Sequence, residues 1–184
     1  MPSRNIIKKI LSLELEEKIL NGATLIAFVC VFMPWVGGEW LGGKTVTFNG
    51  LGFFTSFIGL FILLVLSFIL LITIIPITGG PKVIRPEYKN SVRLLLAVLA
   101  TLFTVAIWSV LTKFTFEFSR LQIHFGLYGT LIGSLVASLY SFILIQEDKK
   151  NTVNRLFSHN EEAPREPEYQ APDQGMPEDH RKYR

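Results

Sequence analysis

Hydrophobic residues are gathered into four blocks without a charged side chain, and polar residues lie between and after them. The charge-free stretches run over residues 19–36, 45–81, 94–112 and 125–146. A helix rises about 1.5 Å per residue, so roughly 20 apolar residues cross a hydrocarbon layer about 30 Å thick. The pattern therefore predicts an all-α membrane protein, a bundle of four transmembrane helices at about residues 19–36, 51–78, 92–112 and 125–146.

The two ends of the chain differ from this membrane domain of residues 19–146. In residues 1–18 the apolar positions from Ile6 to Leu13 share one helical arc, while Lys8 and Lys9 lie outside it. This predicts an N-terminal amphipathic helix in the membrane interface, with a soluble start to the first span as the alternative. Residues 147–184 are polar and carry four prolines, so we expect a disordered tail, in which residues 149–157 either continue the fourth helix or do not.

The two loops on the outer side contain alternating polar and apolar residues. Residues 40–46 resemble a hairpin with a Gly-Gly turn, and residues 45–48 alternate as a half-buried strand does. Residues 114–119 alternate in the same way. Two interpretations stay open: a small three-stranded β-cap outside the membrane, or a third helix that extends outward through residues 114–119.

The positive residues predict which way the chain faces, because Lys and Arg near short loops are retained on the cytoplasmic side. The outer loops hold three cations, Lys44, Lys113 and Arg120, compared with eleven on the other side of the membrane. These eleven are Arg4, Lys8, Lys9, Lys18, Lys82, Arg85, Lys89, Arg93, Lys149, Lys150 and Arg155. We therefore expect a multi-pass protein of the cell membrane with both termini in the cytoplasm.

The fourth apolar block carries a stripe of small residues. Gly129, Gly133, Ala137 and Ser141 recur every four positions and so lie on one face of a helix. Small side chains allow close approach of helix backbones, which drives helix association in lipid. Two interpretations of this helix-packing face remain open: it packs against the other spans of the same chain, or it packs against a second copy or another protein.

Aromatic and charged residues cluster near the outer ends of the spans. Tryptophan favours the headgroup level, so Trp35, Trp40 and Trp108 are predicted membrane-interface anchors. In the outer cap, the pair Glu117 and Arg120 is a candidate ion pair, with Glu39 as the other acidic partner for this arginine. His124 has no second ligand nearby in sequence, so we interpret it as a structural histidine.

Composition adds little chemistry to this picture. The 184 residues are 49% hydrophobic and 18% charged, with a net charge of +3 and one cysteine. The apolar blocks hold no ionisable group of the kind that carriers place at depth, and no nucleophile, phosphate loop or metal-ligand motif is visible. We therefore expect no enzyme, cofactor, metal or nucleic-acid partner. The hypothesis is a scaffold or accessory subunit of a membrane or envelope complex, in contact with membrane lipids; the alternatives are an oligomeric channel or transport-related protein and a lipid-binding membrane protein.

The first block ends in Phe32-Met33-Pro34-Trp35, followed by a Gly-rich loop, three further blocks and a polar tail. This layout resembles small uncharacterised four-span bacterial membrane proteins in which a Pro-Trp pair ends the first helix. The resemblance covers residues 14–146 and implies a bacterial cytoplasmic membrane without implying an activity. The layout is also distantly similar to claudin-like tetraspans with an outer β-sheet, but the loop here lacks their two cysteines, and a claudin-type adhesion role is not implied.

Overall fold

The computed structural model describes residues 13–40, 43–52, 55–81, 84–117 and 120–161. The chain divides into two units, Met1–Lys149 and Lys150–Arg184, and the described part of the second unit, residues 150–161, is helical. The elements in chain order are α2 (Leu15–Phe32), β1 (Pro34–Trp40), β2 (Lys44–Asn49), α3 (Ser56–Ile77), the 3-10 helix η2 (Pro86–Tyr88), α4 (Lys89–Glu117), β3 (Leu121–Ile123) and α5 (Phe125–Glu161).

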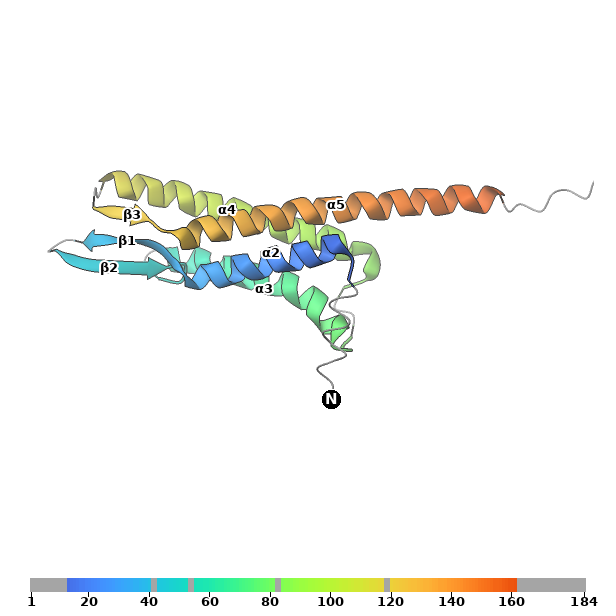
Figure 1. Cartoon of the computed structure of the whole chain (residues 1–184), viewed down its shortest axis with the longest axis horizontal. Helices are drawn as coiled ribbons and strands as arrows, with labels where there is room; N and C mark the ends of the chain where they lie inside the picture. Colours follow the sequence, from blue (N-terminus) through green and yellow to red (C-terminus); the bar gives the residue numbers. More distant parts are fainter. Residues whose placement is uncertain (1–12, 41–42, 53–54, 82–83, 118–119, 162–184) are drawn as a thin grey trace, which may run out of the picture. The chain divides into compact units, whose positions relative to one another are not determined.

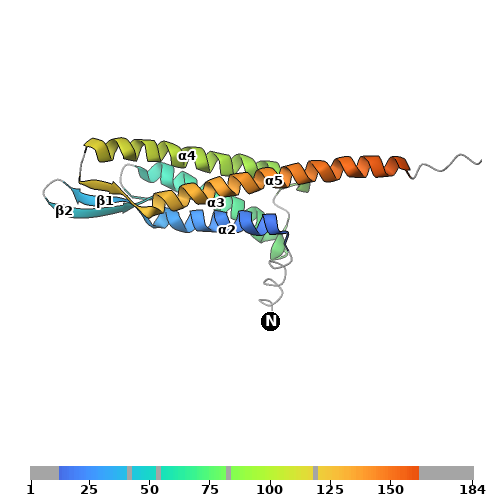
Figure 2. The same cartoon turned by 45° about the horizontal axis from the view of Figure 1, so that its top comes forward.

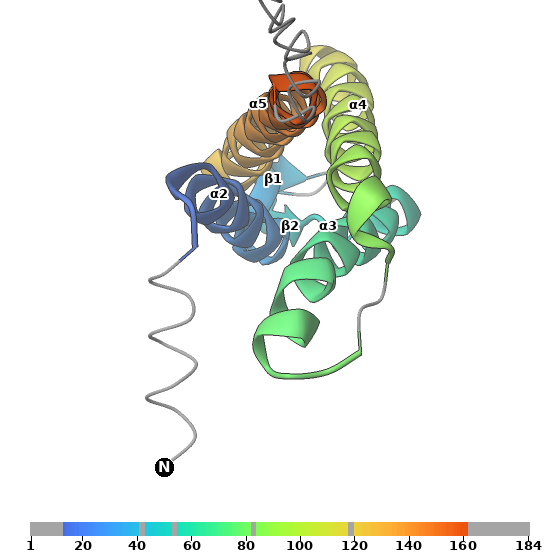
Figure 3. The same ribbon diagram turned by 90° about the vertical axis from the view of Figure 1, so that its right-hand side faces the viewer.

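Four helices of the first unit pack around a common apolar core. Successive helices run in opposite directions (Figures 1 and 2). Viewed along the bundle, α2 and α4 each lie between α3 and α5 (Figure 3). Each helix turns a buried apolar stripe inward, with fully buried side chains such as Leu20 in α2, Leu66 in α3, Ile107 in α4 and Leu127 in α5.

The outward sides of these helices are apolar as well. Ile26, Leu64, Leu102 and Leu139, one from each of the four helices, are all more than half exposed. Such surfaces suit contact with lipid chains better than contact with water. Three helical segments are long and apolar enough to cross a membrane: Ser56–Ile77, Lys89–Glu117 and Phe125–Phe157. The chain is therefore a mainly helical membrane protein.

The first helix, α2, is not among these three segments. Its first turn carries Glu16, Glu17 and Lys18, which leaves residues 19–32 as the uncharged part, about 21 Å long at 1.5 Å per residue. The predicted span continued to residue 36, but α2 ends at Phe32, because Pro34 opens strand β1. The prediction of four crossing helices is thus supported by length and composition for three of them.

A three-stranded antiparallel sheet lies at the end of the bundle where α2 ends and α5 begins (Figure 1). The strand order is β2-β1-β3. Strand β1 pairs with β2 from Pro34 and Asn49 to Trp40 and Lys44, as the hairpin prediction expected. The turn glycine Gly43 has φ +78°, a conformation that glycine adopts without strain.

The two interpretations of the outer loops turn out to be compatible. Helix α4 does extend to Glu117, and a three-stranded sheet forms as well. The place predicted for the third strand, residues 114–119, was wrong, because β3 is Leu121–Ile123. The helix continues because Ile107, Leu111 and Phe114, at spacings of four and three, remain on its buried face.

The helix ends also refine the predicted boundaries. Helix α3 ends at Ile77, and Gly79 with φ +90° follows; the N–H groups of Gly79 and Gly80 donate to the carbonyls of Pro76 and Ile75, which is a Schellman ending. The predicted tail begins at residue 147, but α5 continues to Glu161, which confirms the helical alternative for residues 149–157; no proline lies between residue 125 and Pro164 to interrupt the helix. Residues 1–12 and 162–184, which hold most of the predicted interfacial helix and tail, lie outside the described residues.

Candidate functional site

A buried arginine joins three helices at the end of the bundle opposite the sheet. The side chain of Arg93, in the second turn of α4, is 0% exposed. Its Nη1 donates to Oε1 of Glu17 in α2 at 2.9 Å, and its Nη2 donates to the hydroxyl of Thr73 in α3. Lys89 adds a second cation, with its Nζ 2.5 Å from the same Glu17 oxygen. We call Glu17, Thr73, Lys89 and Arg93 the charged clamp.

The charged clamp forms because both ends of its main ion pair lie at the edge of an apolar block. Glu17 precedes the first block by two residues, and Arg93 immediately precedes the third. In the antiparallel bundle these two edges meet, which brings the guanidinium of Arg93 within hydrogen-bond distance of the Glu17 carboxylate. The sequence prediction counted Arg93 only as a cation for orientation, although the opposite charges at one membrane edge were a signal for the pair.

The clamp extends to the fourth helix through an exposed contact. The Nδ2 of Asn90 donates to Oδ2 of Asp148 in α5 at 2.6 Å. At this end, side chains of α4, including Arg93, therefore contact each of the other three helices of the bundle. The Nε of Arg93 in the clamp and the Oδ1 of nearby Asn21 are buried without a hydrogen-bond partner among the described residues. Unsatisfied groups of this kind make the region sensitive to the loss of any further partner.

The small residues of α5 face α2. A Cβ added to Gly129 would lie 2.5 Å from Sγ of Cys30, and one added to Gly133 would lie 2.8 Å from the carbonyl oxygen of Ala23. Ala137 is fully buried and Ser141 is 1% exposed on the same stripe. The helix-packing face is thus used inside the chain, at least from Gly129 to Gly133.

The close approach continues from the helices into the sheet. A Cβ on Gly126, which the sequence prediction did not include, would lie 2.5 Å from the carbonyl oxygen of Pro34. The backbone N–H of His124 donates to the carbonyl of Trp35 at 2.9 Å, and β1 and β3 then pair from Val36 and Ile123 onward. We call the contact of Gly126, Gly129 and Gly133 with α2 and the start of β1 the glycine seam.

The predicted interface anchors occupy different environments. Trp35 is 1% exposed, and its Nε1 donates to the carbonyl of Cys30 at 3.0 Å, so it is a core residue beneath the sheet rather than a side chain at the lipid surface. Trp108 is 37% exposed and packs edge-on against Tyr128 of α5, with ring centroids 6.0 Å apart. The backbone of Trp40 ends β1.

The outer ion pair forms with the second of the two acidic candidates. Arg120 Nη1 donates to Oε2 of Glu39 in β1 at 2.6 Å, and both side chains are at least half exposed. Glu117, the other candidate partner of this arginine, is exposed at the end of α4. Among the described residues the arginine is therefore paired across the sheet rather than along its own loop.

One group of carboxylates is close enough to share a cation. Ligand oxygens of Glu14, Glu16 and Glu147 lie within 4.8 Å of one another at the start of α2 and on α5. Exposed acidic groups of this kind are common without a metal, and the geometry alone assigns none here.

The charged clamp and the glycine seam each join segments far apart in the sequence. Comparisons with known protein families, curated proteins and solved structures find no match.

Proposed function

We propose that the chain is a non-enzymatic integral membrane protein that crosses the membrane four times and acts as an accessory or scaffolding subunit of a membrane or envelope complex. In this proposal both termini are cytoplasmic and the sheet stands outside. The charged clamp then lies at the cytoplasmic edge of the bilayer, and the glycine seam lies in its outer half.

The fourth crossing is assigned to α2 because of its neighbours. This helix packs along α3 and α5, and its outward residues Leu25, Ile26 and Val29 are 53%, 60% and 44% exposed. A helix held between two membrane-crossing helices lies in the same layer. Lys18 can extend its ammonium toward the headgroups while its stem stays at the apolar edge, which compensates for the short uncharged stretch.

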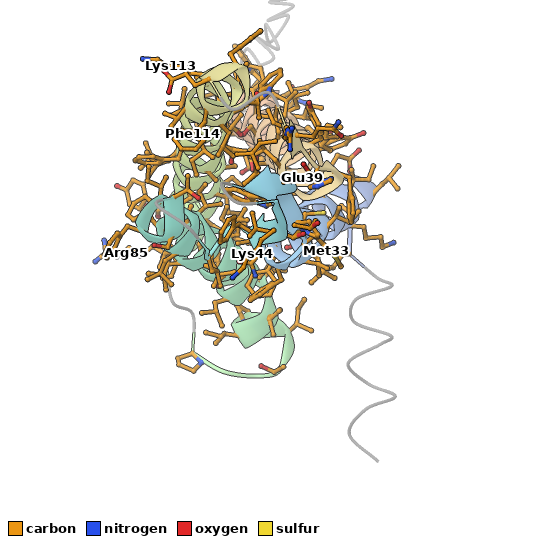
Figure 4. All side chains as sticks on the ribbon, turned by 90° about the vertical axis from the view of Figure 1, so that its left-hand side faces the viewer. Met33, Glu39, Lys44, Arg85, Lys113 and Phe114 are labelled. Atoms are coloured by element: carbon orange, nitrogen blue, oxygen red, sulfur yellow. The ribbon has the colours of Figure 1, made fainter. Side chains whose placement is uncertain are left out.

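The edge of the sheet supports a role in assembly. In the order β2-β1-β3, strand β2 pairs on one side only within the described part of the chain, and its residues Lys44, Thr45 and Thr47 are exposed. Figure 4 looks onto this end, with Glu39 and Lys44 labelled. An open strand edge offers backbone groups to an extended segment of a partner. Because α5 already packs on α2, we place the partner at this edge rather than on the fourth span.

A pull-down from native membranes in mild detergent tests the proposal. We expect a stoichiometric partner to be recovered with the full chain and lost when Thr45 is changed to Lys, because a charge on the edge strand opposes strand addition. Gln122→Lys is the matched control: Gln122 is exposed on β3, next to α4, and the change adds the same charge to the sheet.

Two outcomes contradict the proposal. Recovery of the lone monomer from native membranes removes the basis for a scaffold. Ion flux through the purified protein in liposomes favours the channel alternative instead.

A further inference from the structure

A shallow pocket of about 310 Å³ lies at the end of β2 nearest the helices. It is lined by six residues from α2, β1, β2 and the turn after β2: Phe32, Pro34, Thr47, Phe48, Asn49 and Gly52. Successive side chains of a strand point to opposite faces of the sheet, so a pocket lined by residues 47, 48 and 49 reaches around the strand. Because β1 covers one side of β2, the pocket continues onto the open edge and the end of this strand.

The pocket offers ring surface together with polar groups that are still available. Phe32 is 47% exposed, and Pro34 and Phe48 supply further apolar surface. Thr47 is exposed, and its hydroxyl makes no hydrogen bond to the described residues. The Oδ1 of Asn49 accepts from the backbone N–H two residues later at 3.2 Å, which leaves its Nδ2 as the group that can donate to a ligand.

This lining favours one class of occupant. None of the six lining residues is charged, so a lipid phosphate would find no counter-charge in the pocket. A purely apolar group would cover the Thr47 hydroxyl and the Asn49 amide without pairing them, which costs free energy. An aromatic side chain with a polar tip suits both parts of the lining, and tyrosine is among the residues that carry most binding energy in protein interfaces.

The open strand beside the pocket indicates how such a side chain is presented. Strand β3 lies next to α4, so the free edge of the described sheet is that of β2. A segment added here continues both faces of the sheet, with polar residues beside exposed Thr45 and Thr47 and apolar residues beside half-buried Val46 and Phe48. The residue of that segment that passes Asn49 reaches the pocket.

Symmetry disfavours a second copy of the chain as the source of this segment. Strands β1 and β2 run along the long axis of the bundle (Figures 1 and 2). Two copies in one membrane are related by a rotation about the membrane normal, which is then roughly parallel to β2. This rotation turns the sheet over, so the Val46 face of one copy would continue the Thr47 face of the other. A segment of a different protein avoids this mismatch of apolar and polar faces.

We propose that the pocket receives a tyrosine side chain from an extended segment of a partner protein that pairs with β2 outside the membrane. The ring packs against Phe32 and Phe48, the phenol oxygen accepts a hydrogen bond from Nδ2 of Asn49, and the phenol hydroxyl donates to Thr47. This inference rests on the proposed assembly role and adds the chemistry of the partner: a segment of alternating polar and apolar residues with a tyrosine at the Asn49 end.

Photo-crosslinking of the full chain in native membranes tests the pocket. A photoreactive residue replaces Thr45, which lies on the same strand but outside the pocket, and mass spectrometry identifies the captured peptide. We expect an alternating segment with a tyrosine about four residues from the crosslink. Gly52→Leu fills the pocket, because its Cβ makes only ordinary contacts of 3.4 Å with Asn49 and Phe48, and should lower the yield about tenfold. Gly22→Leu, at an open position on α2, is the matched control and should leave the yield unchanged.

A second variant keeps the test independent of folding, and the outcomes separate the pocket from the assembly role. Thr47→Val keeps the shape of an exposed side chain but removes the hydroxyl, and should lower the yield about threefold. A captured segment without tyrosine, capture of lipid alone, or equal yields from Gly52→Leu, Thr47→Val and the unchanged chain overturns the pocket proposal. If a stoichiometric partner is still recovered in those cases, the assembly role stands; recovery of no partner overturns both.

Discussion

The two ends of the bundle are held together by opposite means. At the clamp end, a fully buried arginine and a nearly buried glutamate join α2 and α4, and the contact is polar and specific in geometry. At the sheet end, backbones approach until glycine is required, as where Gly126 meets Pro34. The ion pair can adjust to a small shift of a helix, but it is lost when either partner is removed. The close backbone contact does not depend on polar groups, but it leaves no room for additional side-chain volume.

The largest effect is expected from breaking the clamp. Glu17→Ala leaves Arg93 buried without its counter-charge, and we expect the free energy of unfolding in detergent to fall by about 3–5 kcal/mol. Glu16→Ala, one residue away and outside every ion pair among the described residues, is the control. The double variant Glu17→Leu with Arg93→Met should recover most of the loss. Full stability of Glu17→Ala would show that the clamp contributes little.

A somewhat smaller effect is expected from adding volume at the seam. Gly133→Ile places side-chain atoms where Ala23 and Ala27 already lie within 3 Å of the Cβ position, and overpacking of this kind costs about 1–3 kcal/mol. Gly22→Ile is the matched control, since its Cβ position is open. Thermal unfolding and particle size in detergent should be measured together. A change of oligomeric state at unchanged stability would instead place this face between copies of the chain.

The next variant tests the junction between bundle and sheet. Trp35→Phe keeps most of the buried ring but removes the hydrogen bond from Nε1 to the carbonyl of Cys30, at a cost of about 1 kcal/mol. Trp108→Phe, in a partly exposed position, should cost less. If denaturant unfolding ranks the two in reverse, Trp108 rather than Trp35 supports the fold.

The smallest effect is expected at the exposed ion pair on the sheet. Arg120→Gln removes its pairing with Glu39, and exposed pairs contribute about 1 kcal/mol or less. The difference should vanish in about 1 M salt, where screening acts over roughly 3 Å. The Glu17→Ala loss should persist at that salt concentration, because Arg93 is shielded from solvent. Equal salt sensitivity of both would remove the distinction between buried and exposed pairing.

The local pattern of apolar and polar residues predicted much of the fold. The apolar blocks predicted both ends of α3 and α4 to within about five residues and the start of α5, although α5 continues well beyond the predicted end at residue 146, and the Gly-Gly pair predicted the hairpin turn at Gly43. The alternation at residues 114–119 misled, because the helical spacing that ends in Phe114 and packs on the core competed with it. Trp35 misled for a similar reason: tryptophan near a helix end is common at membrane surfaces, and its burial depends on Gly50, which packs against the ring only after the hairpin has returned the chain.

The candidate sites were less accessible from sequence. The stripe from Gly129 to Ser141 was visible as a pattern, but its partner helix was not. The clamp pairs residues 76 positions apart, and no local periodicity reports such a pair. The apolar groove between α2 and α3, which Asn21, Leu25 and Leu70 help to line, depends on where α3 ends and slopes away from α2 (Figure 3), which is a property of packing.

By itself the sequence determined the lengths of the apolar segments, the turn at Gly43, the stop after α3 and the presence of a small-residue face, because each depends on neighbours along the chain. Only the tertiary structure decided that this face meets α2, that Glu17 neutralises Arg93, that Arg120 pairs with Glu39, and that a groove remains beside Asn21. These contacts depend on the register between helices, which is set by side-chain packing across the whole bundle.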